Sequence, residues 1–395
     1  MKRHVVLVAP PWYPIPPHGY GGIELVVGLL GDALRQAGHR VTILAAEGSE
    51  PDAIVLAPRS WRSDLGGPDE RLRELTYATR VASTLEELDR IDVVHDHCGF
   101  SSLIAACVTD VAPVVHTVHG DIPEAYSTFY SAISPRAGFV SISAAQRHSM
   151  PGLPWVGTVH NAVDVDRLEV SPGEKEPYLL CLARICPDKG QHVAIEVARR
   201  TGMRLVLAGK VEAMPHTIDY FKRYVAPAID DDRVVHLNNV AGADKTRLLS
   251  RAYALLSPIQ WEEPFGLAMV EAMASGTPVI AMARGAAKEL VTEGVTGFLV
   301  KDVDEMARAV PLAAGVEPWL CADATRARFS PWAMAQAYLR LYDSIARKPV
   351  ARPRLAELTV IGAGVASSIS AAALDARAMG SLPTHSDVAL HATTT

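Results

Sequence analysis

Residues 5–45 contain two short apolar runs, VVLVA at 5–9 and VTILA at 41–45, which flank the segment GIELVVGLLGDALRQA at 22–37. The two runs are rich in β-branched residues, as strands are, whereas the segment between them repeats its apolar residues at helical spacing. Gly38 follows this segment directly and is typical of the residue that ends a helix. A strand, a helix and a second strand in this order predict a parallel sheet covered by helices.

The same alternation continues along the chain, pauses and then starts again. Charged residues, two prolines and a glycine interrupt it at 170–177. Because the apolar runs are nearly continuous, we expect strands that are buried on both faces. The sequence therefore predicts an α/β protein with two facing Rossmann-like domains, joined by a hinge near residues 168–177. The predicted strands are 5–9, 41–45, 91–94, 114–118, 138–142 and 156–159 before the hinge, and 178–182, 204–208, 234–237, 254–257 and 278–281 after it.

The predicted domain organisation has four parts. The N-terminal domain covers residues 1–168 and the C-terminal domain covers residues 169–328. An amphipathic helix that crosses back to the N-terminal domain is predicted at 329–346. Residues 347–395 are predicted to form a low-complexity tail, much of it mobile. The IGAG motif at 361–364 resembles part of a dinucleotide-binding fingerprint. It lacks an evident strand and acidic residue in the required places, so we interpret it as part of the tail.

Composition and charge restrict the class of protein. Hydrophobic residues make up 49% of the 395 residues, which is enough for packed cores, and the net charge of −6 argues against a nucleic-acid partner. Residues 1–169 carry 13 Lys and Arg against 20 Asp and Glu, and this acidic balance disfavours stable docking on anionic membranes. The five cysteines indicate a reducing compartment, and the run at 5–9 is too short for a signal peptide. We expect a cytoplasmic protein.

The strongest candidate site is EEPFGLAMVE at 262–271, which follows a predicted strand and opens a predicted helix. A glycine at this turn lets the backbone N–H groups of Gly266 and Leu267 approach a phosphate at the helix N-terminus. Glu263 and Glu271 flank the turn, and their carboxylates can accept hydrogen bonds from sugar hydroxyls. This combination fits a sugar joined to a nucleoside diphosphate. The alternative is that Glu263 caps the helix and Glu271 is a solvated residue on its surface.

Basic residues follow two other predicted strands. Arg184 and Lys189 lie in LARICPDKG at 182–190, at the carboxyl end of a strand, where open α/β sheets bind ligands. A forked guanidinium and a compact ammonium suit a pyrophosphate, although solvated loop cations are the alternative. Gly209 and Lys210 repeat the same arrangement, with a glycine directly after a strand.

Two segments of the first predicted domain are also expected to lie near the ligand. Glycines in PHGYGGIE at 17–24 permit close backbone approach, but the segment is not G-x-G-x-x-G and lacks the lysine and hydroxyl of a P-loop. The segment HTVHGD at 116–121 ends another strand and is expected to face the same crevice. Three Asp-x-Asp pairs and the HDH segment at 95–97 do not form a recognisable metal site, so we expect no bound metal.

Taken together, these segments resemble a known family. In chain order the sequence contains the motifs GGIE, VHDH, TVHG, HNAVD, LARICPDKG, EEPFGLAMVEAMASGTPVIA and GVTGFLV. This order is similar to that in retaining nucleotide-sugar glycosyltransferases of the GT-B architecture, family four, also called glycosyl transferases group one. The resemblance covers residues 3–346, and the YGGIE opening resembles a bacterial subgroup. Ala162 and Ala286 stand where the family usually has glycine, which bears on subgroup and loop shape.

The resemblance implies roles for individual residues. Arg184 and Lys189 would bind the pyrophosphate, Glu263 would lie near the hydroxyls of the donor sugar, and His119 would lie beside the transferred sugar. Glu271 would hold the ribose. The residues predicted to bind the donor, including two from the strand-end pattern, are Gly22, Gly209, Lys210, Phe265, Gly266, Leu267 and Glu271.

The expected function is that of a retaining hexosyltransferase. By the resemblance, the enzyme moves a sugar from a nucleoside-diphosphate sugar to an acceptor hydroxyl without a metal, and a UDP-linked donor such as UDP-glucose is expected on family frequency. The acceptor would be a small molecule, a glycan or a lipid. The alternatives are a nucleotide-sugar epimerase and a non-catalytic nucleotide-sugar-binding protein.

Overall fold

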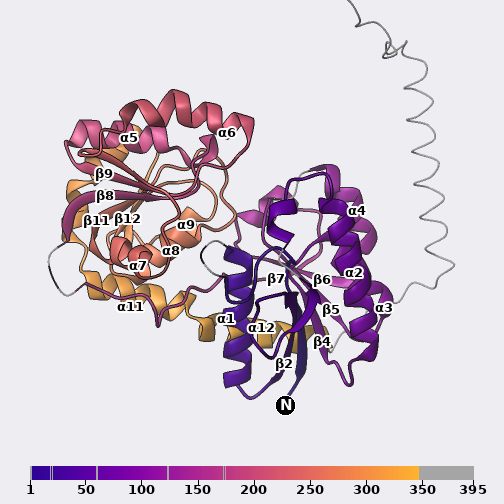
Figure 1. Ribbon diagram of the computed structural model, residues 1–395. Helices are drawn as coiled ribbons and strands as arrows, with labels where there is room; N and C mark the ends of the chain where they lie inside the picture. Colours follow the sequence, from indigo (N-terminus) through magenta and orange to yellow (C-terminus); the bar gives the residue numbers. More distant parts are fainter. Residues whose placement is uncertain are drawn as a thin grey trace, which may run out of the picture. The chain divides into compact units, whose positions relative to one another are not determined.

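The computed structural model describes residues 2–346 apart from 18, 20, 59, 60, 122, 123, 172 and 174. These residues belong to one compact unit, and within it two parallel sheets form two α/β domains. Figure 1 shows the two sheets, each with helices packed against it. This architecture confirms the predicted fold class. The tail predicted at 347–395 and its IGAG motif lie outside the described residues.

The first domain is built on a sheet of seven parallel strands in the order β3-β2-β1-β4-β5-β6-β7. Its central strands are buried along their length, as their apolar sequence predicts. Alternate residues of β1 belong to two separate hydrophobic clusters, one on each face of the sheet. The strands are β1 His4–Val8, β2 Arg40–Ala46, β3 Ile54–Ala57, β4 Val93–Asp96, β5 Val114–Val118, β6 Ala137–Ser141 and β7 Trp155–Thr158.

The second domain repeats this plan with six parallel strands in the order β10-β9-β8-β11-β12-β13. Alternate residues of the central strand β8 again enter two clusters, with Tyr178 and Leu180 on one face and Leu179 and Cys181 on the other. The strands are β8 Glu176–Leu182, β9 Arg204–Ala208, β10 Val234–Leu237, β11 Ala252–Ser257, β12 Val279–Met282 and β13 Gly297–Val300.

Helices connect the strands and cover both sheets. None of the helices in the described residues is long and apolar enough to cross a bilayer. The first domain contains α1 Gly22–Gln36, α2 Glu70–Glu87, α3 Phe100–Thr109 and α4 Ser127–Ile133. The helices that follow are α5 Gln191–Thr201, α6 Pro215–Tyr220, α7 Gly242–Arg251, α8 Leu267–Ala274, α9 Ala287–Leu290, α10 Val303–Ala309, α11 Pro318–Phe329 and α12 Pro331–Ala346.

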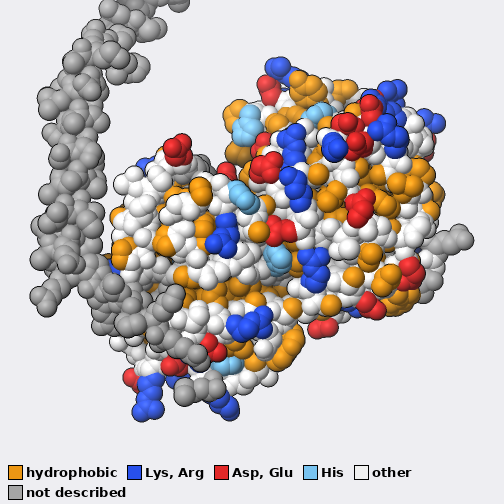
Figure 2. All heavy atoms as spheres, turned by 180° about the vertical axis from the view of Figure 1, so that it is seen from behind, with side chains coloured by type: hydrophobic (Ala, Val, Ile, Leu, Met, Phe, Trp, Pro, Cys, Tyr) orange, Lys and Arg blue, Asp and Glu red, His pale blue; other side chains and the backbone are white. Residues whose placement is uncertain are grey.

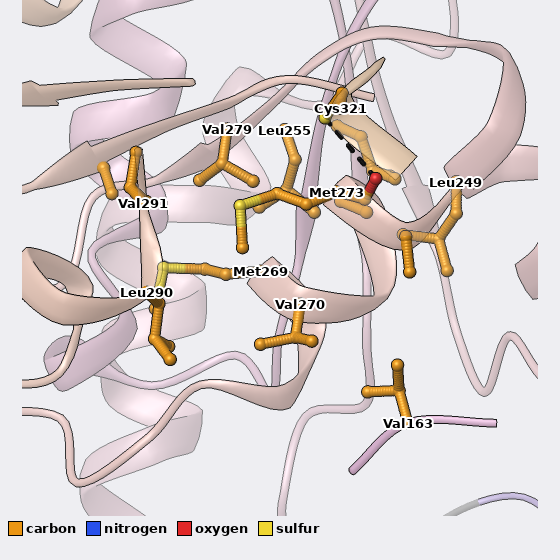
Figure 3. Close-up of a cluster of buried hydrophobic side chains, with 14 of the residues drawn as sticks. Val163, Leu249, Leu255, Met269, Val270, Met273, Val279, Leu290, Val291 and Cys321 are labelled. Atoms are coloured by element: carbon orange, nitrogen blue, oxygen red, sulfur yellow. Dashed lines mark hydrogen bonds between the residues drawn. The ribbon is translucent and has the colours of Figure 1, made fainter. Parts of the chain in front are cut away.

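Helix α8 is anchored in the core of the second domain. Met269, Val270 and Met273 pack among buried side chains of neighbouring strands and helices (Figure 3). The Cys321 thiol of α11 donates to the carbonyl of Met273 over 3.4 Å. Because this apolar packing holds the helix on several sides, its N-terminus is a rigid support for a ligand.

Helix α12, the last described element, packs on the first domain. It lies beside α1, and Figure 1 shows the two helices next to each other. Tyr338 and Tyr342 are fully buried, and their hydroxyls reach Thr117 Oγ1 at 2.8 Å and His95 Nδ1 at 2.7 Å. Apolar packing and buried hydrogen bonds thus both tie this helix to the sheet of the first domain.

Three details differ from the predicted elements. The edge strands β3 and β13 were not predicted, and both have only four residues. The helix predicted over 329–346 begins at Pro331 instead, because Phe329 ends α11 and Ser330 has an extended backbone. A residue before proline disfavours helical dihedrals, which explains the break at Ser330.

Candidate active site

A cavity of about 530 Å³ is lined by loops that follow strands of both sheets. The first domain contributes the N-terminus of α1 and the end of β5, and the second contributes the ends of β8 and β11 and the start of α8. The carboxyl ends of parallel strands are where open α/β sheets place ligand sites. Of the predicted site residues, those lining this cavity are Gly22, His119, Arg184, Lys189, Glu263, Phe265, Gly266 and Leu267.

Lys189 and Glu263 form an ion pair inside this cavity, and both side chains are largely buried. Trp261 supports the pair from two directions. Its indole N–H donates to Glu263 Oε2 over 2.9 Å, and its ring lies 5.4 Å from the Lys189 ammonium. The Glu263 carboxylate therefore faces the lysine and the indole, which excludes the alternative that it caps α8.

The turn before α8 has the conformation that a phosphate cradle requires. Gly266 adopts a φ of 102°, and a Cβ there would lie 2.4 Å from the Met269 side chain. Any other residue would be strained at this position. The turn leaves the first backbone N–H groups of α8 without intrahelical acceptors, as at every helix N-terminus. The amides of Gly266 and Leu267 are thus available to an anion in the cavity.

A second cavity of about 450 Å³ adjoins the first, and Gly22, Arg184 and Leu267 line both. Gly209, Lys210 and Glu271 complete the predicted set around it. Glu271 is only 7% exposed and forms a 2.6 Å ion pair with Lys245 of α7. This burial excludes the alternative that Glu271 is a solvated surface residue.

Glu212 links two of the predicted cations. Its carboxylate lies 2.7 Å from Arg184 and 3.2 Å from Lys210. Although burial raises the pKa of Glu212, the charge and hydrogen bond of Arg184 and the interaction with Lys210 lower it overall. The lowered pKa keeps the carboxylate ionised, so it holds the two cations beside the second cavity.

Gly209 enables the close packing of this region. Its φ is 156°, and a Cβ would fall 1.9 Å from the carbonyl oxygen of Ala183. The backbone after β9 therefore passes directly against the backbone after β8. Only glycine permits this approach, which brings Lys210 and Arg184 to the same cavity.

Glu24 is a carboxyl on the first domain's side of the larger cavity. It lies in the first turn of α1 and is only 3% exposed. Burial raises the pKa of Glu24 to about 7. A carboxyl with this pKa exchanges its proton near neutral pH, and in its neutral form it can donate a hydrogen bond as well as accept one.

His119 reaches the same cavity and is backed by a second histidine. His97 is 1% exposed, and its Nδ1 lies 2.9 Å from His119 Nε2. Burial, together with the charge of His116, lowers the pKa of His119 to about 3, and burial likewise lowers the pKa of His97 well below its usual value. Both rings are therefore neutral at physiological pH, and their hydrogen bond joins one N–H to one bare nitrogen.

All predicted site residues thus line one or both of two adjoining cavities. Four residues that line the cavities or pair with lining residues were not predicted from the sequence: Glu24, Glu212, Lys245 and Trp261. Only Glu24 and Trp261 carried a local signal, since both lie within or beside quoted motifs. Within the described residues, no group of three or more His, Cys, Asp or Glu side chains is placed to hold a metal ion.

The chain matches two family models that follow each other along the sequence. Residues 20–167 match Glycosyltransferase Family 4, and residues 164–330 match Glycosyl transferases group 1. Among curated proteins, a glycogen synthase of Mycobacterium tuberculosis is 28% identical over 352 residues, which cover 75% of this chain and 83% of that protein.

Solved structures show the same architecture. AviGT4, a glycosyltransferase involved in avilamycin A biosynthesis, is 26% identical with a TM-score of 0.67, covering 88% of this chain and 99% of that chain. Anabaena Alr3699/HepE in complex with UDP-glucose has a TM-score of 0.66 at 18% identity, covering 86% of this chain and 99% of that chain, and this likeness concerns the fold alone.

The protein has two domains, each built on a parallel sheet, with cavities at the carboxyl ends of the strands. These features define a glycosyltransferase of the GT-B architecture. The consecutive family matches make the assignment more specific. The chain is a family 4 glycosyltransferase that acts on nucleotide sugars, with a group 1 domain as its second half.

Proposed function

We propose that the enzyme transfers a hexosyl group from a UDP-linked sugar to an acceptor hydroxyl, with retention of configuration and without a metal ion. The observation that carries this proposal is the arrangement of two cations, a helix N-terminus and two buried carboxylates around adjoining cavities. The UDP-glucose complex of Alr3699/HepE, a protein with this fold, supports the choice of donor.

The proposed roles of the cations follow from the charge that develops during the reaction. Cleavage of the sugar–phosphate bond leaves negative charge on the diphosphate and positive charge on the sugar ring. Arg184 and Lys189, with the amides of Gly266 and Leu267, stabilise the departing diphosphate in a site that needs little reorganisation. These groups can neutralise the leaving group themselves, which supports a metal-independent reaction.

Glu263 and Glu271 bind different parts of the donor. Glu263 lies in the larger cavity with His119, and both contact the hydroxyls of the transferred sugar. Glu271 lies in the second cavity and accepts hydrogen bonds from the ribose. The acceptor enters the larger cavity from the first domain's side, and the leaving phosphate takes the acceptor's proton on the same face of the sugar. This same-face route gives retention.

Replacement of Lys189 tests the proposal. We expect Lys189→Ala to lower kcat/KM about 10²–10³-fold, because a preorganised group that stabilises the leaving charge contributes about 3–4 kcal/mol. The assay is release of UDP from UDP-glucose with a panel of sugar and polyol acceptors, in the presence of a chelator. The matched control is Lys222→Ala, which removes an exposed lysine of the same domain.

The same assay separates this function from the alternatives. Full turnover by a folded Lys189→Ala protein would contradict the site assignment, and loss of turnover in chelator would contradict metal independence. An epimerase would convert the donor sugar without an acceptor, which an NMR time course detects. The anomeric configuration of the product, read in the same spectrum, tests retention.

A further inference from the structure

The ion pair between Lys245 and Glu271 joins two helices at the wall of the second cavity. Lys245 Nζ lies 2.6 Å from Glu271 Oε1, and the lysine side chain is 31% exposed against 9% for the carboxylate. Both residues line the cavity. Glu271 Oε2 has no hydrogen-bond partner elsewhere in the described part of the chain. One oxygen of this buried carboxylate is therefore held, and the other is left to a ligand.

The fold fixes the lysine where it can act on the carboxylate. Lys245 lies near the N-terminus of α7, and Leu249, one turn later on the same helix face, is fully buried in the core. Helix α7 packs against α8, on which Glu271 lies one turn beyond the start. Both partners thus extend from packed helices, and the pair has little freedom to rearrange.

We propose that Lys245 is a positioning residue, which orients Glu271 so that the site selects ribonucleoside diphosphates over their 2′-deoxy analogues. This inference rests on the proposed function, because it takes Glu271 as the ribose ligand. A vicinal diol can donate two hydrogen bonds to a carboxylate, and it can do so with good geometry only if the carboxylate is fixed. The lysine supplies this constraint through its contact with Oε1.

The competing explanation is a purely structural pair that fastens α7 to α8. This explanation predicts that loss of Lys245 weakens the binding of every nucleotide equally or changes the binding of none. The proposed role predicts instead that only the contribution of the 2′-hydroxyl is lost. The ratio of two affinities therefore separates the explanations, whereas a single affinity does not.

The experiment measures dissociation constants by calorimetry for UDP, ADP and GDP, each paired with its 2′-deoxy analogue. We expect wild-type protein to bind its preferred ribonucleotide about tenfold or more tightly than the analogue, since a site built to accept a hydroxyl rejects a ligand without it. In Lys245→Met, which keeps the length of the chain without its charge, we expect this ratio to fall towards one. The affinity for the 2′-deoxy compound should change little.

Two further variants complete the design. Lys245→Arg keeps the charge and should retain most of the ratio, and Lys222→Met is the control for loss of an exposed lysine. If Lys245→Met does not fold, Lys245→Gln replaces it. An unchanged ratio in the folded variant, or a wild-type ratio of one, would overturn the inference and leave the proposed function standing. Wild-type protein that binds none of the six nucleotides would contradict both.

Discussion

At the scale of single residues, Glu24 couples the larger cavity to pH. Burial raises its pKa from 4.5 to about 7, so the native state holds this proton up to near-neutral pH while the unfolded chain releases it. The stability that Glu24 contributes therefore falls between pH 4.5 and 7, and this loss is complete above pH 7. The difference in pKa corresponds to about 3 kcal/mol as an upper value.

We predict that Glu24→Gln removes this dependence. The variant should gain stability relative to wild type as the pH rises from 4.5 to 7.5, by up to about 3 kcal/mol in the free energy of unfolding, because a neutral amide has no proton to lose. Urea unfolding at a series of pH values measures the difference. A constant offset between the two proteins across this range would show that Glu24 ionises normally in the native state.

His97 is predicted to fix the tautomer of His119. His97 Nε2 is buried without a partner among the described residues. A buried N–H with no acceptor is costly, so the His97 proton is expected on Nδ1, where it can be donated to His119 Nε2. His119 then carries its own proton on Nδ1.

The prediction for His97 is tested by ring ¹⁵N chemical shifts in protein labelled at histidine. Wild type should show His119 protonated at Nδ1, and His97→Asn should keep this pattern because its amide can donate from a similar position. His97→Leu removes the donor, so the proton of His119 should shift towards Nε2, and turnover should fall about tenfold. The same pattern in wild type and His97→Leu would contradict the assignment.

At the scale of elements, α12 is held by buried hydrogen bonds as well as by packing. Tyr342→Phe removes the hydroxyl that contacts His95 Nδ1 and leaves that buried nitrogen without this partner. We predict a loss of about 1–3 kcal/mol in the free energy of unfolding. Chemical denaturation measures it, with Tyr224→Phe at an exposed tyrosine as the control. Equal stability of the two variants would show that packing alone holds the helix.

The elements also show what sequence patterns can predict. The central strands were predictable from their apolar, β-branched runs, and the turn at Gly266 because glycine follows a strand and precedes a helix. The edge strand β3, Ile54–Ala57, was not predicted. Lys245 and Glu212 reach the site only through packing between distant segments, so no local signal marks them.

At the scale of the whole molecule, contacts between the two domains form the cavities. A Cβ on Gly22, at the start of α1, would lie 3.1 Å from the Leu267 side chain at the start of α8. Elsewhere, Glu289 of α9 accepts hydrogen bonds at 3.0 Å from the backbone N–H groups of Ala144 and Ala145. On the face seen in Figure 2, basic and acidic side chains are interspersed.

The most direct test is a crystal structure of the enzyme with bound UDP. We expect the diphosphate to lie between the side chains of Arg184 and Lys189 and the backbone N–H groups of Gly266 and Leu267, with the ribose hydroxyls on Glu271. In this complex Lys189 would have exchanged part of its contact with Glu263 for a phosphate oxygen. Density for UDP outside these two cavities, or a diphosphate that contacts neither cation, would contradict this expectation.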